Sequence, residues 1–135
     1  MDTASRTLIS ACLLGARCRY DGQSKPRPLP DLGAVVPVCP EVMAGLGIPR
    51  PAIERGADGR VRVQQTGQDI TERLDRACGQ IVALAQRRGI RKAILKERSP
   101  SCGSAQLRRG GEVVAGQGLL TERLRAAGFE VVSDE

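Results

Sequence analysis

Cysteine can act as a nucleophile, a redox group or a metal ligand, and it occurs five times in this sequence, which has no histidine. Three of the five lie near proline or glycine: Cys12 in SACLLG, Cys39 in VCPE and Cys102 in SPSCG. Without histidine there is no mixed Cys/His zinc site, and without a Cys-x-x-Cys pair there is no zinc ribbon or thioredoxin-type redox turn. Three gathered thiolates could hold zinc with one open position, or three corners of an iron–sulfur cube with one iron free. These residues alone leave both alternatives open.

The remaining two cysteines have simpler interpretations. Cys78 lies on the apolar face of a predicted helix and is expected to be a small core residue. Cys18 lies in a polar loop six residues after Cys12, where it is either a ligand or redox partner or an incidental exposed thiol. Gly103, next to Cys102, is expected to let backbone N–H groups approach a bulky anion, because glycine has no Cβ.

The elements that must position these residues alternate between strands and helices. The longest predicted helix starts at an Asp69 N-cap, with Glu72 three residues later as in a capping box, and stops at Gly89. Short apolar runs predict buried strands, and Gly-containing polar segments predict turns. The expected strands are residues 7–14, 34–39, 91–97 and 129–132, and the other expected helices are 40–47 and 119–128. A hairpin-like segment is expected at 48–67, and one half of a hairpin at 111–116.

This order of elements predicts an α/β fold, a small three-layer sandwich with a largely parallel sheet of the Rossmann or flavodoxin kind. In such sheets ligands bind beyond the carboxyl ends of the strands. Cys12, Cys39 and Cys102 fall at or just past predicted strand ends. We therefore expect their side chains to meet although they are far apart in the sequence.

Length and composition predict one domain, residues 1–135, with an aliphatic core, because Tyr20 and Phe129 are the only aromatic residues. That scarcity argues against a base-stacking surface for RNA. The formal net charge of +6 either keeps the surface solvated or attracts an anionic partner such as RNA, and the scattered arginines favour the first.

The apolar patch near the N-terminus does not resemble a signal peptide, because Asp2 precedes it and the polar stretch GARCRYDG follows it. No apolar run reaches the length of a transmembrane helix. An odd number of widely spaced cysteines also fits poorly with a secreted disulfide framework. We therefore predict a cytoplasmic protein with reduced thiols and no membrane partner.

Four blocks of the sequence resemble the DUF523 family, whose characterised member type is a thiouracil desulfidase. They appear in the family's order and extend over nearly the whole chain. The blocks are ISACLLGARCRYDG, VCPEVMAGLGIPRP, TGQDIT and LKERSPSCG.

The resemblance implies a [4Fe–4S] cluster held by Cys12, Cys39 and Cys102, with the fourth iron open to substrate; Cys18 is not in the implied ligand set. The implied reaction is non-redox removal of sulfur from a small thiolated nucleobase of the 2-thiouracil type, giving uracil and hydrogen sulfide. The open iron would act as a Lewis acid towards the soft thiocarbonyl sulfur. Glu41, two residues after a ligand, would activate water as a general base.

Glu41, Ser99 and Ser101 are the catalytic candidates. Without the resemblance, Glu41 is an acidic residue in the first turn of a helix, and the serines are ordinary turn residues. With it, either hydroxyl could orient the base ring or pass a proton to the departing sulfur, and the sequence does not choose between them. Lys96 could point towards the site as a cation near negative charge, or simply solvate a strand end. The residues that could shape the pocket, or else form salt bridges within their loops, are Arg19, Tyr20, Asp21 and Arg50.

Two other functions remain open at this point. The family contributes a domain to larger proteins that act on thiolated tRNA, and the positive charge is compatible with desulfuration of RNA; salt-dependent tRNA binding would support it. A non-catalytic metal or sulfur carrier would use the same thiols. Iron with acid-labile sulfide indicates the enzyme, and zinc without sulfide indicates the carrier.

Overall fold

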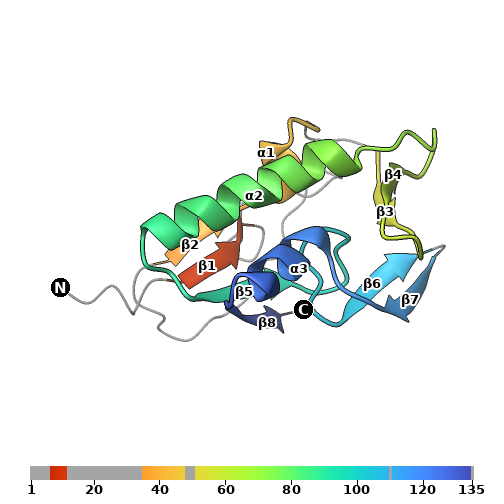
Figure 1. The fold of residues 1–135 in the computed structure, drawn as a ribbon. Coiled ribbons are helices and arrows are strands. Elements are labelled where there is room, and N and C mark those ends of the chain that lie inside the picture. The colour runs from red at the N-terminus through yellow and green to blue at the C-terminus, as the bar shows by residue number, and fades with distance from the viewer. Residues whose placement is uncertain (1–6, 12–34, 48–50, 110, 135) are drawn as a thin grey trace.

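A four-stranded parallel sheet forms the centre of the computed structural model, which describes residues 7–11, 35–47, 51–109 and 111–134 (Figure 1). The strands lie in the order β2-β1-β5-β8 and every neighbouring pair is parallel. This confirms the predicted α/β fold with a largely parallel sheet. The strands are β1 (Thr7–Ser10), β2 (Val35–Val38), β5 (Lys92–Lys96) and β8 (Glu130–Asp134).

The strand order reverses direction beside β1. The chain passes from β1 to β2 on one side and then returns to β5 on the other side of β1. Such a switch point is where α/β sheets bind ligands, beyond the carboxyl ends of the strands. Cys39 directly follows β2, and the segment that carries Cys102 follows β5.

Strand β1 ends four residues earlier than the apolar run 7–14 predicted. Its last residue is Ser10, whose hydroxyl oxygen accepts the backbone N–H of Lys96 at 2.9 Å. The Ser10 side chain thus binds the Lys96 N–H, which a longer β1 strand would have bound through its backbone. Pro37 is accommodated in β2 because β2 lies at the edge of the described sheet. An edge strand has a neighbouring strand on one side only, so it tolerates a residue without a backbone N–H.

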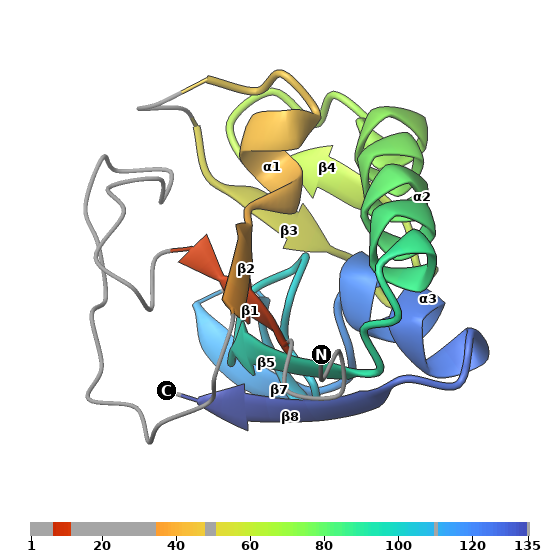
Figure 2. The ribbon, with the colours of Figure 1, turned by 90° about the vertical axis from the view of Figure 1, so that its left-hand side faces the viewer.

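Two helices pack together on one face of the sheet, α2 (Thr71–Arg87) and α3 (Leu119–Ala126) (Figure 2). The apolar face of α2 is buried in an aliphatic core, as the helical spacing predicted. The N-cap is Ile70, so the prediction of an Asp69 N-cap was wrong by one residue. Asp69 still serves the helix start, because its Oδ1 accepts the N–H of Thr71 at 2.9 Å. The buried residues of α2 are Leu74, Ala77, Cys78, Ile81 and Ala85.

Helix α2 ends where glycine was expected to stop it. Gly89 has a φ of 69°, and the N–H of Ile90 reaches back to the carbonyl of Ala85 at 2.9 Å. This is the Schellman arrangement, which satisfies carbonyls that the helix end leaves open. None of the helices in the described ranges has the length and apolar character needed to cross a bilayer.

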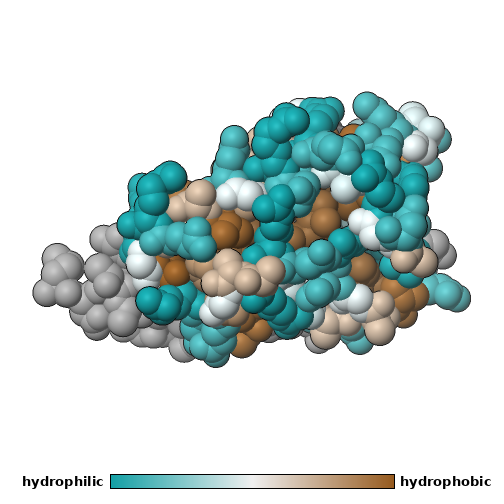
Figure 3. Space-filling view, viewed as in Figure 1, coloured by the Kyte–Doolittle hydropathy of each residue, from teal (hydrophilic) through white to brown (hydrophobic). Residues whose placement is uncertain are grey.

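Two antiparallel ribbons complete the described fold, at one end of the molecule (Figure 1). The first ribbon lies in the segment predicted to be hairpin-like, and β7 lies in the segment predicted to be one half of a hairpin, whose other half, β6, was not predicted. The Arg109 Nε donates to the carbonyl of Arg55 at 2.8 Å and joins the two ribbons. The face seen in Figure 3 is largely hydrophilic. The ribbons are β3 (Ile53–Arg55) with β4 (Val61–Val63), and β6 (Gln106–Arg109) with β7 (Glu112–Ala115).

Candidate functional site

Cys39 lies where β2 gives way to the one-turn helix α1 (Pro40–Met43). It is the N-cap residue, with extended backbone (φ −140°, ψ 102°), and its carbonyl accepts the N–H of Met43 at 3.0 Å. Pro40 occupies the first helical position, where its missing N–H does no harm. The helix is far shorter than the predicted 40–47, and Gly45, with a φ of 79°, lies just beyond its end. The half-buried Cys39 and Glu41 are therefore held close together on a tight turn.

The segment 99–103 forms a second tight turn and carries the buried Cys102. The Ser99 hydroxyl oxygen accepts the backbone N–H groups of Ser101 and Cys102, each at 3.1 Å. The carbonyl of Ser99 accepts the N–H of Gly103 at 2.8 Å. Ser99 is thus engaged in shaping the turn around Cys102, which is the role that serine takes in side-chain turns.

The start of α3 holds this turn from the other side. The N–H of Leu120 donates to the carbonyl of Ser101, and the Thr121 hydroxyl donates to the carbonyl of Cys102, both at 2.9 Å. A Cβ atom on Gly118 would lie 2.3 Å from the carbonyl carbon of Ser101, so only glycine fits there. The Leu120 N–H is one of the N-terminal donors of α3 that have no partner within the helix.

Gly103 has a reason for being glycine that differs from the expected approach of an anion. A Cβ atom there would lie 2.3 Å from the carbonyl oxygen of Gln106 and 3.0 Å from that of Ser99. The close approach is therefore between segments of this chain. The glycine is needed for the turn itself.

One hydrogen bond joins the two turns. The Ser101 hydroxyl donates to Oε2 of Glu41 at 2.8 Å, across 60 positions of sequence. Ser101 is fully buried and Glu41 is half-buried. The structure therefore brings together Glu41 and Ser101, and with them the backbone segments of Cys39 and Cys102, at the carboxyl ends of β2 and β5.

Several predicted residues fall outside the described part of the chain. Within that part, no three His, Cys, Asp or Glu side chains gather into a metal site. The cysteines in that part are Cys39, Cys78 and Cys102. The predicted residues outside it are Cys12, Cys18, Arg19, Tyr20, Asp21 and Arg50.

Cys78 is a core residue by both its position and its acidity. It is fully buried in α2, and burial raises the pKa of its thiol to about 12. At neutral pH it therefore stays protonated, which makes it a poor nucleophile and a poor metal ligand.

Alanine at Cys78 is expected to lower the free energy of unfolding by about 1 kcal/mol, as for a small core truncation. Iron content and activity should not change, because the buried thiol stays protonated and is not among the expected cluster ligands. Urea unfolding and iron analysis measure the two effects. Loss of iron in this variant would place Cys78 among the ligands and contradict the core assignment.

Sequence reasoning missed Glu97, Gly118 and Thr121. Glu97 is buried and binds the loop that contains Cys102; its position as the last residue of the predicted strand 91–97 was the available signal. Lys96, predicted to point towards the site or to solvate a strand end, donates from Nζ to the carbonyl of Glu97 at 3.0 Å.

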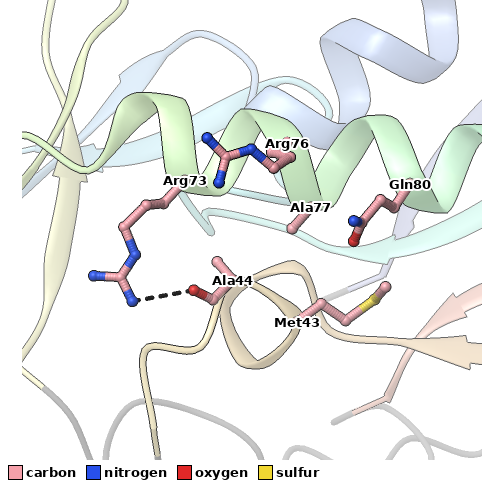
Figure 4. Close-up of a pocket in the computed structure, with 6 residues that line it drawn as sticks. All are labelled: Met43, Ala44, Arg73, Arg76, Ala77 and Gln80. Carbon is pink, nitrogen blue, oxygen red and sulfur yellow. Dashed lines mark hydrogen bonds between the residues drawn. The ribbon is translucent and has the colours of Figure 1, made fainter.

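A cleft of about 250 Å³ lies between α1 and α2 (Figure 4). One wall is braced by Arg73, whose Nη2 donates to the carbonyl of Ala44 at 3.2 Å. The cleft includes none of the predicted site residues. Its lining residues are Met43, Ala44, Arg73, Arg76, Ala77 and Gln80.

Known proteins resemble this chain along most of its length. The family model for 2-thiouracil desulfurase matches residues 7–135. The uncharacterized protein YbbK of Bacillus subtilis (strain 168) is 35% identical over 142 residues, covering 94% of each chain. A solved structure of the [4Fe–4S]-dependent thiouracil desulfidase TudS (DUF523Vcz) superposes with a TM-score of 0.89 and 41% identity, covering 96% of this chain and 90% of that one.

Proposed function

Since this chain belongs to the 2-thiouracil desulfurase family, we propose that it is an enzyme that hydrolyses the C=S bond of 2-thiouracil to give uracil and hydrogen sulfide. The family resemblance inferred from the four sequence blocks is thereby confirmed. The observation that carries the proposal is the hydrogen bond between Ser101 and Glu41. It places a carboxylate and a buried hydroxyl beside two cysteine-bearing turns.

The proposed cofactor is a [4Fe–4S] cluster, the group on which the structural relative TudS depends. The proposed ligands are Cys12, Cys39 and Cys102. The described donors fit such a group, because Cys39 and Cys102 lie on turns joined by the Glu41–Ser101 bond, and cysteine thiolates are the usual ligands of iron–sulfur clusters. When bound, the cluster would supply a Lewis-acidic iron with affinity for the soft thiocarbonyl sulfur.

Glu41 is proposed to be the general base. Water adds to the carbon of the C=S bond while the Glu41 carboxylate accepts one of its protons. The C–S bond then breaks, the carbonyl forms, and the sulfur leaves with protons as hydrogen sulfide. One water is consumed and no electrons are exchanged, so the reaction needs no oxidant or reductant.

Ser101 is proposed to orient Glu41, since its hydroxyl donates to Oε2 at 2.8 Å. Hydrogen bonds to an ionised group are stronger than neutral ones and fix its direction. For Ser99 we propose the supporting role of shaping the turn, because its oxygen accepts two backbone N–H groups. Of the two serines, the geometry favours Ser101 as the one that acts beside the reacting atoms.

The test is anaerobic purification followed by iron and sulfide assays and incubation with 2-thiouracil. We expect iron with acid-labile sulfide, loss of the thiouracil absorbance, and release of hydrogen sulfide in equal amount. Zinc without sulfide, and no turnover, would instead indicate a metal or sulfur carrier. Sulfide release from thiolated tRNA but not from the free base would identify RNA as the substrate and overturn the small-molecule proposal.

A further inference from the structure

Glu97 directly follows β5, and its carboxylate is buried, with 7% of the residue exposed. A buried carboxylate is costly unless hydrogen bonds replace the water that it has lost. Its Oε1 accepts backbone N–H groups and its Oε2 accepts a hydroxyl, all from residues 98–106. The N–H donors are Arg98 (3.2 Å), Ser104 (2.9 Å), Ala105 (3.3 Å) and Gln106 (3.2 Å), and the hydroxyl is that of Ser104 (3.1 Å).

These donors come from both ends of the segment that contains Ser101 and Cys102. Arg98 begins the segment, and residues 104–106 end it. Because one carboxylate binds both ends, the segment between them is closed into a ring. Arg98 has a φ of 66°, a left-handed conformation that is uncommon outside glycine, and this conformation accompanies its N–H bond to Glu97.

The middle of the ring is held separately, by the bonds from α3 to the carbonyls of Ser101 and Cys102. We propose that Glu97 is a positioning residue, which sets where the Ser101 hydroxyl and the Cys102 thiol lie by fixing the two ends of their loop. This inference rests on the proposed function for its meaning, since the loop carries the donor to Glu41 and one proposed cluster ligand. The hydrogen bonds that support it do not depend on that function.

The test compares Glu97→Ala with Glu97→Gln in the full-length protein. Alanine leaves the N–H groups around Oε1 without an acceptor. Glutamine keeps a carbonyl oxygen for those N–H groups and can donate its NH₂ to the Ser104 hydroxyl, so it should retain much of the loop. The readouts are amide hydrogen exchange over residues 98–106 and the alkylation rate of Cys102, located by mass spectrometry.

We expect Glu97→Ala to raise both rates about tenfold or more, since N–H groups that have lost their acceptor favour opening of the loop. Glu97→Gln should raise them by a smaller factor, because a neutral acceptor is weaker. The matched control is Ile81→Ala, which truncates a fully buried side chain in α2 and reports the effect of lower global stability alone.

Rates in Glu97→Ala no faster than in Ile81→Ala would overturn the proposal. If the alanine variant does not fold, the glutamine variant decides, and exchange unchanged from the wild type in that variant overturns it as well. Failure of the proposed function is a separate result. A wild-type protein that does not act on 2-thiouracil would refute the desulfidase assignment, whereas the exchange and alkylation rates would still report on Glu97.

Discussion

Glutamine in place of Glu41 is expected to lower kcat for 2-thiouracil hydrolysis by about 100- to 10,000-fold, the usual contribution of a positioned general base. Glutamine has nearly the same shape and can still accept the hydrogen bond from Ser101, but it cannot take a proton from water. Iron and sulfide content should stay at the wild-type level. Steady-state kinetics and metal analysis on the same preparation measure both.

The matched control for this change is Glu112→Gln, which alters an exposed carboxylate on β7 and should leave kcat unchanged. Ser101→Ala removes the donor to Glu41 but keeps the carboxylate, so we expect a smaller loss of about tenfold, typical of one hydrogen bond to a charged group. Undiminished activity of the Glu41 variant would exclude this residue as the base. Loss of iron in the same variant would indicate that Glu41 holds the metal site and does not act as the base.

Alanine at Cys102 is expected to abolish both the cluster and turnover. The proposed site uses three thiolates, and alanine offers no donor in place of the one that it removes. The protein should still fold, because the truncation is small and the turn is held by backbone bonds to α3. Visible absorbance, iron and acid-labile sulfide measure the cluster, and circular dichroism checks the fold.

Cys39→Ala and Cys12→Ala should give the same result, and Cys78→Ala, which truncates a buried thiol of α2, is the matched control. An intact cluster in any of the first three variants would remove that residue from the ligand set. If the Cys102 variant kept its cluster, the turn between β5 and α3 would not supply a ligand to the metal site.

Much of the fold could be predicted because its signals are local. The apolar period of α2 identifies the buried face of that helix, and Gly89 and Gly128 mark helix ends because they adopt positive φ, 69° and 88°. The prediction failed where a distant partner intervened. Strand β1 stops at Ser10 because the hydroxyl there binds the backbone of Lys96, 86 positions away in sequence.

The candidate site divides in the same way. The sequence blocks around Cys39 and Cys102 were enough to predict the family, and the positions of these cysteines after strands predicted the edge of the sheet where we propose the site. The sequence could not decide between Ser99 and Ser101, since both belong to one turn next to Cys102. Our proposal of Ser101 rests on packing, because the Ser99 oxygen accepts N–H groups of its own turn and the Ser101 hydroxyl donates to Glu41.

The sequence by itself therefore determined the class of fold, the order of its elements and the family, because apolar spacing, turn residues and motifs are properties of short segments. Only the tertiary structure decided that Ser101 meets Glu41, that Gly118 must be glycine, and that the Glu97 carboxylate closes the loop around Cys102. These contacts join segments that are distant along the chain or that meet only through a buried group. Their geometry is set when the helices and strands pack, and no short stretch of sequence contains it.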